Sequence, residues 1–357
     1  MEKTVLIMAG GQGERFWPYS RKKKPKQFLC LTDEKRTMIQ LTLDRALGYT
    51  TADKIFVVTN QDYFPLVREQ LPELLPEHIL CEPASRNTAP CIALGAAWIR
   101  KQFGDALMAV LPADHSIQIP TLFREALEAA SAVAREGVHL VTLGITPSAP
   151  ETGYGYIRFD PARPMAGRAY RVERFIEKPE LEVARKLVAS GEYLWNSGIF
   201  VWKASSYLEC VARYLPELTD GLRAIDSSLG SAAYPQVLRD AYSAFPSVSV
   251  DRGILEKADQ IFTIPGTFGW DDIGSWPSVS RILQADGQDN ILRGNILPVH
   301  TRNSFIRSSG KLIAAIGVEN LIIMDTEDTL LVCSKDRTGD IPQVLQELRR
   351  QGLEEYL

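Results

Sequence analysis

The stretch Met8-Ala-Gly-Gly-Gln-Gly-Glu-Arg-Phe-Trp-Pro-Tyr-Ser-Arg-Lys-Lys-Lys-Pro-Lys-Gln-Phe28 decides how this chain is interpreted. It follows an apolar run at residues 4–8, which predicts a buried strand that ends at a glycine. Three glycines then let the backbone turn sharply and approach a ligand closely. Successive amide groups in such a turn form a concavity that binds anions. These glycines are Gly10, Gly11 and Gly13.

Two cations follow the glycines and indicate a polyphosphate ligand. Arg15 offers a planar guanidinium that is always charged, and Lys26 offers a mobile ammonium group. The dinucleotide fingerprint would require a third glycine at position 16, which is Phe16, and the P-loop pattern is absent. A strand-to-helix turn with a solvated basic run at residues 21–24 is the alternative that the stretch alone leaves open.

Length and composition describe an ordinary globular protein. A chain of 357 residues is long for one core and predicts two domains. A net charge of −4 gives no overall field toward nucleic acid or an anionic membrane, and no apolar run reaches the length of a membrane span. The five cysteines show no C-x-x-C spacing, which favours reduced thiols and a cytoplasmic location.

Strands and helices alternate through the first part of the chain. This rhythm predicts parallel crossovers and a doubly wound sheet, whose ligands bind beyond the carboxyl ends of the strands. The glycine turn, Glu82 and Asp114 all lie at or just after such strand ends, so we expect them to share one crevice. The predicted strands are 4–8, 55–59, 79–82, 107–111 and 138–145, and the predicted helices are 37–47, 63–71, 88–103, with Thr88 as its cap, and 122–135.

The later parts of the chain change in character. Residues 153–159 and 170–176 predict an antiparallel pair, Pro179 is expected to begin a helix that runs to residue 190, and 195–202 predicts another strand. From about residue 286, short apolar runs alternate with turn residues, which suggests a sandwich or a coiled β-solenoid, closed by a helix over 341–348. We therefore predict a catalytic domain over 1–285 and a smaller domain over 286–357.

Two aspartates are candidate metal ligands. Asp114 and Asp272 follow an apolar run and a tight turn, respectively, and carboxylates that converge near phosphates usually hold magnesium. A single aspartate at a strand end is more often a helix cap or a surface group. Lys178 and Asn196 also have ordinary interpretations, as a surface residue before a helix and as a turn former.

Seven motifs in order resemble those of the mannose-1-phosphate guanylyltransferases, and the resemblance spans nearly the whole chain. The R-N-T-A-P and P-K-Q-F motifs separate this branch from thymidylyl- and uridylyltransferases. Departures are small. Tyr19 stands where leucine is usual, and Arg252 and Gly253 stand after Asp251 where the family often has tyrosine and a small residue. Asp271 lies next to Asp272 and makes the metal assignment at that loop ambiguous. The motifs are G-x-G-x-R-F-x-P with P-K-Q-F at 11–28, E-P-x-x-R-N-T-A-P at 82–90, P-A-D-H at 112–115, T-G-Y-G-Y-I at 152–157, F-I-E-K-P at 175–179, N-S-G-I-F at 196–200 and G-W-x-D-I-G-S-W at 269–276.

The resemblance implies a fold and an activity. The fold would be an α/β nucleotidyltransferase domain, a Rossmann-like, GT-A-like doubly wound mixed sheet, with a small β-helix-like C-terminal domain that makes dimer contacts. The enzyme would transfer GMP from GTP to α-D-mannose 1-phosphate by magnesium-assisted in-line attack on the α-phosphate, in the cytoplasm and as a homodimer. The chain ends before the cupin isomerase domain of bifunctional relatives, so the resemblance implies a monofunctional form.

The resemblance also assigns roles to single residues. The glycine loop would hold the triphosphate, and Glu82, supported by the turn after it, would accept hydrogen bonds from guanine. The implied catalytic residues are Arg15, Lys26, Asp114, Lys178 and Asp272, with Asp114 and Asp272 as metal ligands. The implied substrate-binding residues are Gly10, Gly11, Gly13, Glu82, Arg86, Asn87, Thr88, Gly155, Glu177, Asn196 and Asp251.

Two other functions stay open at this point. One is a guanylyltransferase for another manno-configured sugar phosphate, such as a heptose. The other is a non-catalytic regulatory protein that binds sugar nucleotides, although the joint presence of the five charged catalytic candidates argues against it.

Overall fold

The computed structural model describes residues 1–165 and 168–357. The chain forms two compact units. The first unit comprises Met1–Gly10, Thr42–Ala113 and Ile117–Trp270, and the second comprises Gly11–Leu41, Asp114–Ser116 and Asp271–Leu357. We describe each unit by itself, and the predicted domain boundary at residue 285 stays a prediction. Among the described residues, no helix has both the length and the apolar character needed to cross a membrane.

A nine-stranded mixed sheet forms the first unit, which confirms the predicted doubly wound α/β fold. Its strand order is β3-β2-β1-β4-β9-β6-β10-β8-β7, and the first four strands are parallel. β9 runs antiparallel to both of its neighbours, β4 and β6. The strands are β1 Lys3–Ala9, β2 Ile55–Asn60, β3 Ile79–Glu82, β4 Leu107–Pro112, β6 Leu140–Ile145, β7 Gly155–Phe159, β8 Tyr170–Glu177, β9 Tyr193–Lys203 and β10 Ile261–Gly266.

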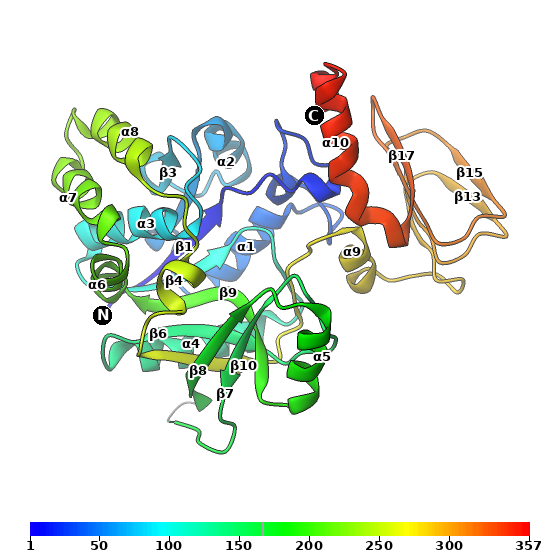
Figure 1. The fold of residues 1–357 in the computed structure, drawn as a ribbon. Helices are drawn as coiled ribbons and strands as arrows, with labels where there is room; N and C mark the ends of the chain where they lie inside the picture. Colours follow the sequence, from blue (N-terminus) through cyan, green and yellow to red (C-terminus); the bar gives the residue numbers. More distant parts are fainter. Residues whose placement is uncertain (166–167) are drawn as a thin grey trace. The chain divides into compact units, whose positions relative to one another are not determined.

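Helices cover both faces of this sheet (Figure 1). α3 packs closely on β1, because a Cβ on Gly95 would lie only 2.4 Å from the Leu6 side chain. Its Leu94 and Ile99 are buried with Phe56 of β2 in the main core. α4 packs against β6, β9 and β10. The helices are α2 Phe64–Gln70, α3 Thr88–Phe103, α4 Pro120–Arg135, α5 Leu181–Ser190, α6 Ala204–Tyr214, α7 Thr219–Ser228 and α8 Tyr234–Ala244, and α1 Met38–Leu47 begins in the second unit and ends in the first.

Short strands in a coil and two helices form the second unit, which confirms the predicted β-helix-like C-terminal part. β12, β14 and β16 pair in parallel, β17 adds antiparallel to β16, and β13 pairs in parallel with β15. Phe16, Trp276 and Phe305 are almost fully buried and form the centre of its core. The elements are β12 Ile291–Arg293, β13 Ile296–Val299, β14 Phe305–Arg307, β15 Ile313–Ile316, β16 Leu321–Asp325, β17 Leu330–Ser334, α9 Trp276–Ile282 and α10 Ile341–Arg350, and the two-residue strands are β5 Ser116–Ile117 and β11 Trp270–Asp271.

Several helix starts differ from the prediction by one or two residues, and α3 keeps its predicted start but has a different cap. The cap of α3 is Asn87, whose side chain accepts a hydrogen bond from the Thr88 amide at a backbone φ of 67°. With a ψ of −171°, Asn87 lies in a backbone region that residues other than glycine rarely adopt, so its backbone is strained. α5 begins at Leu181 instead of Pro179, because Glu180 keeps an extended backbone.

Candidate functional site

The glycine loop is shaped by a close contact with Lys26. Gly13 has a φ of 65°, and a Cβ on it would lie 2.3 Å from the Cβ of Lys26. The Ser20 hydroxyl donates to the Gly13 carbonyl at 2.6 Å and so closes the turn from the other side. A Cβ on Gly11 would meet nothing within 4 Å. The turn therefore requires glycine at position 13, both for its backbone conformation and for space.

Lys26 joins the two predicted metal-ligand positions. Its Nζ donates at 2.7 Å to a carboxylate oxygen of Asp114 and at 2.7 Å to the backbone carbonyl of Asp272. The Lys26 side chain is 6% exposed and that of Asp114 is 34% exposed. Burial by itself would raise the pKa of Asp114, but the charges of Lys26 and His115 outweigh it and lower this pKa. Asp114 is therefore held as a carboxylate.

Arg15 and Asp272 crowd around Gly274. A Cβ on Gly274 would lie 3.1 and 3.2 Å from the carboxylate oxygens of Asp272 and 3.5 Å from a guanidinium nitrogen of Arg15. Arg15 also donates to the Gly274 carbonyl at 3.3 Å. The neighbouring Asp271 forms an ion pair with Arg281 at 2.9 Å and accepts from the Ile273 amide at 2.8 Å. The Asp271 carboxylate is thus engaged in structural contacts.

The oxygens at this place suit a magnesium ion. Magnesium prefers oxygen ligands and usually takes one or two carboxylates together with substrate phosphates and water. Asp114 supplies an ionised carboxylate, and Asp272 follows it in the same unit, beside the cations Arg15 and Lys26. Over the part of the chain that the structure describes, no group of three or more His, Cys, Asp or Glu side chains is placed to hold a metal ion.

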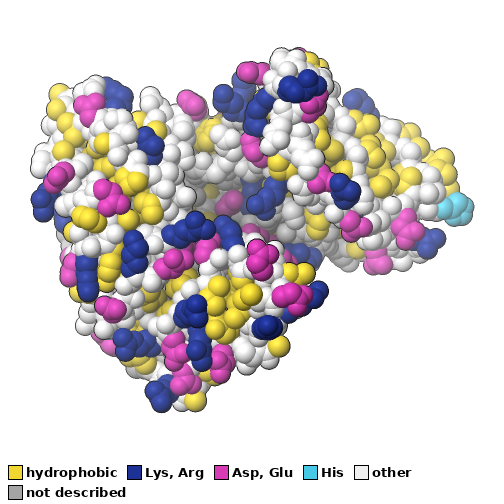
Figure 2. All heavy atoms as spheres, viewed as in Figure 1, with side chains coloured by type: hydrophobic (Ala, Val, Ile, Leu, Met, Phe, Trp, Pro, Cys, Tyr) yellow, Lys and Arg dark blue, Asp and Glu magenta, His cyan; other side chains and the backbone are white. Residues whose placement is uncertain are grey.

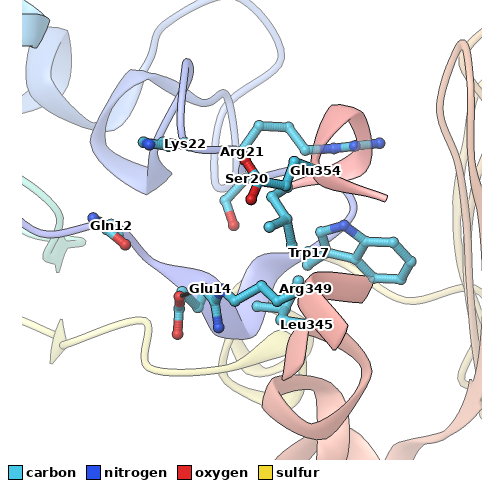
Figure 3. A pocket seen from close by; sticks show the side chains of 10 residues that line it. Gln12, Glu14, Trp17, Ser20, Arg21, Lys22, Leu345, Arg349 and Glu354 are labelled. Atoms are coloured by element: carbon cyan, nitrogen blue, oxygen red, sulfur yellow. Dashed lines mark hydrogen bonds and ion pairs between the residues drawn. The ribbon is translucent and has the colours of Figure 1, made fainter. Parts of the chain in front are cut away.

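The loop is held on its other side by the C-terminal segment (Figure 3). Arg349 of α10 forms an ion pair with Glu14 at 2.6 Å. The Trp17 indole donates at 2.7 Å to the carbonyl of Tyr356, which also accepts from Arg21. These contacts border a cavity of about 290 Å³, whose lining residues include those labelled in Figure 3. Glu14, which lies between Gly13 and Arg15, is therefore bound to α10, more than 300 residues away in sequence.

In the first unit, Glu82 lies beside the end of β1, as the parallel strand order predicts. A Cβ on Gly10 would lie 3.7 Å from a carboxylate oxygen of Glu82. Glu82 is 6% exposed, and its Oε1 has no hydrogen-bond partner among the residues that the structure describes. Burial raises the pKa of Glu82 to about 7, and the neighbouring Tyr242 and Cys91 lower it only in part. A buried carboxylate oxygen without a donor is suited to a ligand that brings N–H groups.

The side chains of the R-N-T turn after Glu82 bind the protein's own backbone. Arg86 donates to the carbonyls of Tyr242 and Ser243 at 2.8 and 2.9 Å. The Thr88 hydroxyl accepts from the Val250 amide at 2.8 Å, and Asn87 caps α3. Thr88 thus holds the segment just before Asp251, Arg86 holds the last turn of α8, and Asn87 fixes the start of α3, so all three side chains shape the backbone.

The remaining predicted residues of the first unit form one cluster. The Asn196 amide donates to Asp251 at 2.8 Å, and a Cβ on Gly155 would lie 2.6 Å from Glu177 Oε2 and 3.5 Å from the Cβ of Asn196. Lys178, with a φ of 48°, lies with its Nζ 3.3 Å from Glu177. Burial, together with the charge of Glu177, raises the pKa of Asp251 to about 6. Polar groups of both signs thus gather where strands β7, β8 and β9 meet.

Three residues that contact the predicted site residues or their sequence neighbours could not be identified from the sequence motifs. Thr142 of β6 donates to Asn196 at 2.9 Å, and nothing in its apolar strand marks it. Ser20 is part of the opening stretch, but only the fold shows that it closes the glycine turn. Arg349 has the ordinary spacing of a charged helix face, so its partner Glu14 could not be inferred.

Comparisons with known proteins cover both units. Residues 4–289 match the family described as nucleotidyl transferase, and residues 294–348 match a MannoseP isomerase/GMP-like beta-helix domain. A mannose-1-phosphate guanylyltransferase of Escherichia coli is 40% identical over 355 residues, which are 98% of this chain and 75% of that protein. The xanthan biosynthesis protein XanB of Xanthomonas campestris is 39% identical over 353 residues, which are 98% of this chain and 74% of that protein.

A solved structure is similar over almost the whole chain. The crystal structure described as a mannose-1-phosphate geranyltransferase from Thermus thermophilus has a TM-score of 0.89 and 32% sequence identity. The similarity covers 98% of this chain and 100% of that one.

Proposed function

This chain belongs to the family of mannose-1-phosphate guanylyltransferases, and on that premise we propose that it transfers GMP from GTP to α-D-mannose 1-phosphate. The products are GDP-mannose and pyrophosphate. The family membership confirms the resemblance that the motifs indicated.

The observation that supports this proposal best is the set of contacts of Lys26. One buried ammonium group holds the Asp114 carboxylate and the Asp272 carbonyl, and Lys26 also packs against the glycine turn. Arg15 lies beside the Asp272 carboxylate. A loop of amide donors, two cations and two carboxylates are what a triphosphate with a divalent ion requires.

The reaction needs no general base. A phosphate oxygen of mannose 1-phosphate is already an anion, so it forms its bond to the α-phosphorus of GTP while the bond from that phosphorus to the bridging oxygen breaks. The electron pair leaves with pyrophosphate. Catalysis must come from positioning and from stabilising negative charge, which we assign to the glycine loop, Arg15 and Lys26.

We assign the magnesium ion to Asp114 and Asp272. When bound, it would neutralise charge on the phosphates. Lys26 would keep Asp114 ionised and in place, since its ammonium group donates directly to that carboxylate.

The first unit would recognise the guanine and the sugar phosphate. The Oε1 atom of Glu82, buried without a partner, would accept the adjacent N–H donors of guanine. Lys178 would bind the phosphate of the sugar, while Glu177 and Asn196 would bind mannose hydroxyls beside Gly155 and Asp251. Arg86, Asn87 and Thr88 would shape the backbone after Glu82.

We also propose a homodimer formed through the C-terminal strands, in a cytoplasmic enzyme whose five cysteines are all unpaired. Large apolar side chains on β13, β15 and β17 are exposed, among them Leu297 at 54%, Ile316 at 68% and Leu330 at 59%. Figure 2 shows hydrophobic side chains gathered over these strands. The variant Ile316→Lys should shift the sedimentation coefficient from that of a dimer to that of a monomer. A parent protein that is a monomer, or a variant that remains a dimer, would contradict the assignment.

The proposed reaction is tested by measuring pyrophosphate release from each nucleoside triphosphate with mannose 1-phosphate, with and without magnesium. We expect release with GTP and magnesium, at least 100-fold faster than with ATP. Equal use of ATP would contradict the guanine assignment. Faster turnover with a manno-configured heptose 1-phosphate would assign the enzyme to that sugar, and no turnover with any combination would favour a regulatory protein.

The same assay tests the metal assignment with a matched pair of variants. Asp272→Asn should abolish turnover, whereas Asp271→Asn should retain it, because the Asp271 carboxylate is engaged by Arg281 and the Ile273 amide. Equal loss in both variants would contradict the choice of Asp272.

A further inference from the structure

Asn196 lies in a bulge of β9, directly beside β6. Thr142 of β6 pairs with Phe200, and Gly144, two residues further on, pairs with Asn196, so two steps along β6 match four along β9. Gly198, with a φ of 70°, provides the left-handed residue within the bulge. Bulges of this kind re-aim a side chain and are common beside active sites. The N-S-G motif is therefore the sequence of a bulge that presents Asn196.

The hydrogen bonds around Asn196 allow one orientation of its amide. Above the pKa of about 6 of Asp251, this carboxylate is ionised and can only accept, so the Nδ2 of Asn196 must face it, at 2.8 Å. The Oδ1 atom then faces two donors, the Thr142 hydroxyl at 2.9 Å and the Gly198 amide at 3.3 Å. Of these two, the Thr142 contact is the shorter and comes from a fully buried side chain.

We propose that Thr142 is a positioning residue for the sugar phosphate. Its hydroxyl fixes the Asn196 amide, so that Asp251 takes one Nδ2 hydrogen and the second remains for a hydroxyl of the mannose ring. The inference rests on the proposed function, because it takes Asn196 as a ligand of the sugar. Thr142 belongs to none of the family motifs and lies between two apolar neighbours in β6.

A structural role is the alternative, since the Thr142 hydroxyl also lies 3.4 Å from the Ile199 carbonyl. The chain offers a matched control for it. Thr263 of β10 pairs directly with Thr142 in the same sheet and is also fully buried, but within the described ranges 1–165 and 168–357 its hydroxyl has no hydrogen-bond partner. Removing the hydroxyl at 263 therefore tests the packing of this layer without touching Asn196.

The test uses the full-length protein with the variants Thr142→Val, Thr142→Ser, Thr263→Val and Asn196→Ala. Thr142→Val keeps the shape of the side chain and removes the hydroxyl, whereas Thr142→Ser keeps the hydroxyl and removes a methyl group. We expect Thr142→Val to raise KM for mannose 1-phosphate about tenfold, with KM for GTP within twofold of the parent. In Thr142→Ser, KM for both substrates should stay within twofold of the parent despite a lower Tm. Thr263→Val should have the same two KM values as the parent.

Equilibrium binding gives a second measurement that does not depend on turnover. Calorimetric titration should show a Kd for GDP-mannose about tenfold weaker in Thr142→Val, while the Kd for GDP stays unchanged. An unchanged Kd and KM for the sugar in Thr142→Val, or an equal loss in Thr142→Ser or Thr263→Val, would overturn the inference.

The failure of the proposed function would look different. If the parent protein binds neither GDP-mannose nor mannose 1-phosphate, or if Asn196→Ala leaves both affinities unchanged, the assignment of Asn196 to the sugar falls, and the role of Thr142 falls with it. If Asn196→Ala weakens binding of the sugar phosphate and Thr142→Val does not, only the proposed role of Thr142 is wrong.

Discussion

The ammonium group of Lys26 lies 2.7 Å from the carboxylate of Asp114, although 88 residues separate them in sequence. Lys26 was predicted as a counter-ion for phosphate and Asp114 as a metal ligand, and the fold pairs them directly. The pair joins the loop that would hold the triphosphate to the residue that would hold the metal. In the proposed reaction, the role of either residue would depend on the other.

The variant Lys26→Met tests this dependence. It leaves the Asp114 carboxylate without its cation, and breaking a largely buried pair costs about 3 kcal/mol of the free energy of unfolding. We expect that loss in urea denaturation, together with a fall of at least 100-fold in kcat/KM. Lys26→Arg keeps the charge and should recover most of the stability. Full activity in Lys26→Met would contradict the assigned role.

The variant Gly13→Ala tests the shape of the glycine loop. Its Cβ would lie 2.3 Å from that of Lys26 at a φ of 65°, so the loop must shift. Such backbone strain costs about 1–3 kcal/mol, and we expect KM for GTP to rise at least tenfold in steady-state assays. Gly339→Ala, outside the glycine loop, is the control, because a Cβ there meets nothing within 4 Å. Equal effects of the two variants would show that space at position 13 is not what matters.

The raised pKa of Glu82 leads us to expect that stability and GTP binding change in opposite directions with pH. Its pKa is about 7 in the folded protein against 4.5 for an unperturbed carboxyl, so between these values the folded state holds one more proton. The free energy of unfolding should therefore fall as pH rises from about 4.5 to 7, by the order of 3 kcal/mol. GTP binding should change the other way, because only the ionised Glu82 accepts two N–H donors, so KM for GTP should rise below pH 7.

The variant Glu82→Gln separates these effects. It should remove the pH dependence of stability that this carboxyl causes and raise KM for GTP about 10-fold or more, since a hydrogen bond to a charged group contributes about 1.5–3 kcal/mol. Glu77→Gln, at an exposed position just before β3, should change neither. Stability is measured by chemical denaturation from pH 5 to 8. The same pH dependence in the parent and in Glu82→Gln would contradict the raised pKa of Glu82 in the folded protein.

The contact between Arg349 and Glu14 predicts a smaller effect. The two side chains are 49% and 41% exposed, and such pairs contribute about 0.2–1 kcal/mol. Arg349→Gln should raise KM for GTP by about two- to fivefold, with kcat and KM for the sugar within twofold of the parent. The difference should shrink in 0.5 M salt, which screens an exposed ion pair. Arg350→Gln is the control, because Arg350 pairs with Glu347 on its own helix.

Much of the fold could be predicted from the sequence, because its parallel strands are short apolar runs that end at glycine or polar residues. The meeting of Gly10 with Glu82 follows from that order, since parallel strands bring their carboxyl ends to one edge of the sheet. The C-terminal strands were recognisable from their regular spacing. Pattern could not settle between a sandwich and a coil, because both repeat short strands and turns.

The detailed contacts of the candidate site could not be predicted. The direction of the Arg86 guanidinium toward two backbone carbonyls depends on where the last turn of α8 lies, which no local pattern records. The cap of α3 is Asn87 instead of the expected Thr88, whose hydroxyl accepts from the Val250 amide, a contact across 162 residues of sequence that no local pattern records. Thr142 reaches Asn196 through a bulge, and although Gly198 within an apolar run is compatible with a bulge, nothing in the sequence tells which residue of another strand Asn196 then meets.

The most direct test of the central claim is phosphorus NMR of the full reaction. With GTP, mannose 1-phosphate and magnesium, the proposed transfer predicts that the sugar-phosphate monoester signal disappears as two coupled diphosphate signals of GDP-mannose and one pyrophosphate signal appear in equal molar amounts. Release of GDP with inorganic phosphate, or an unchanged monoester signal, would contradict attack on the α-phosphate and with it the account of this enzyme.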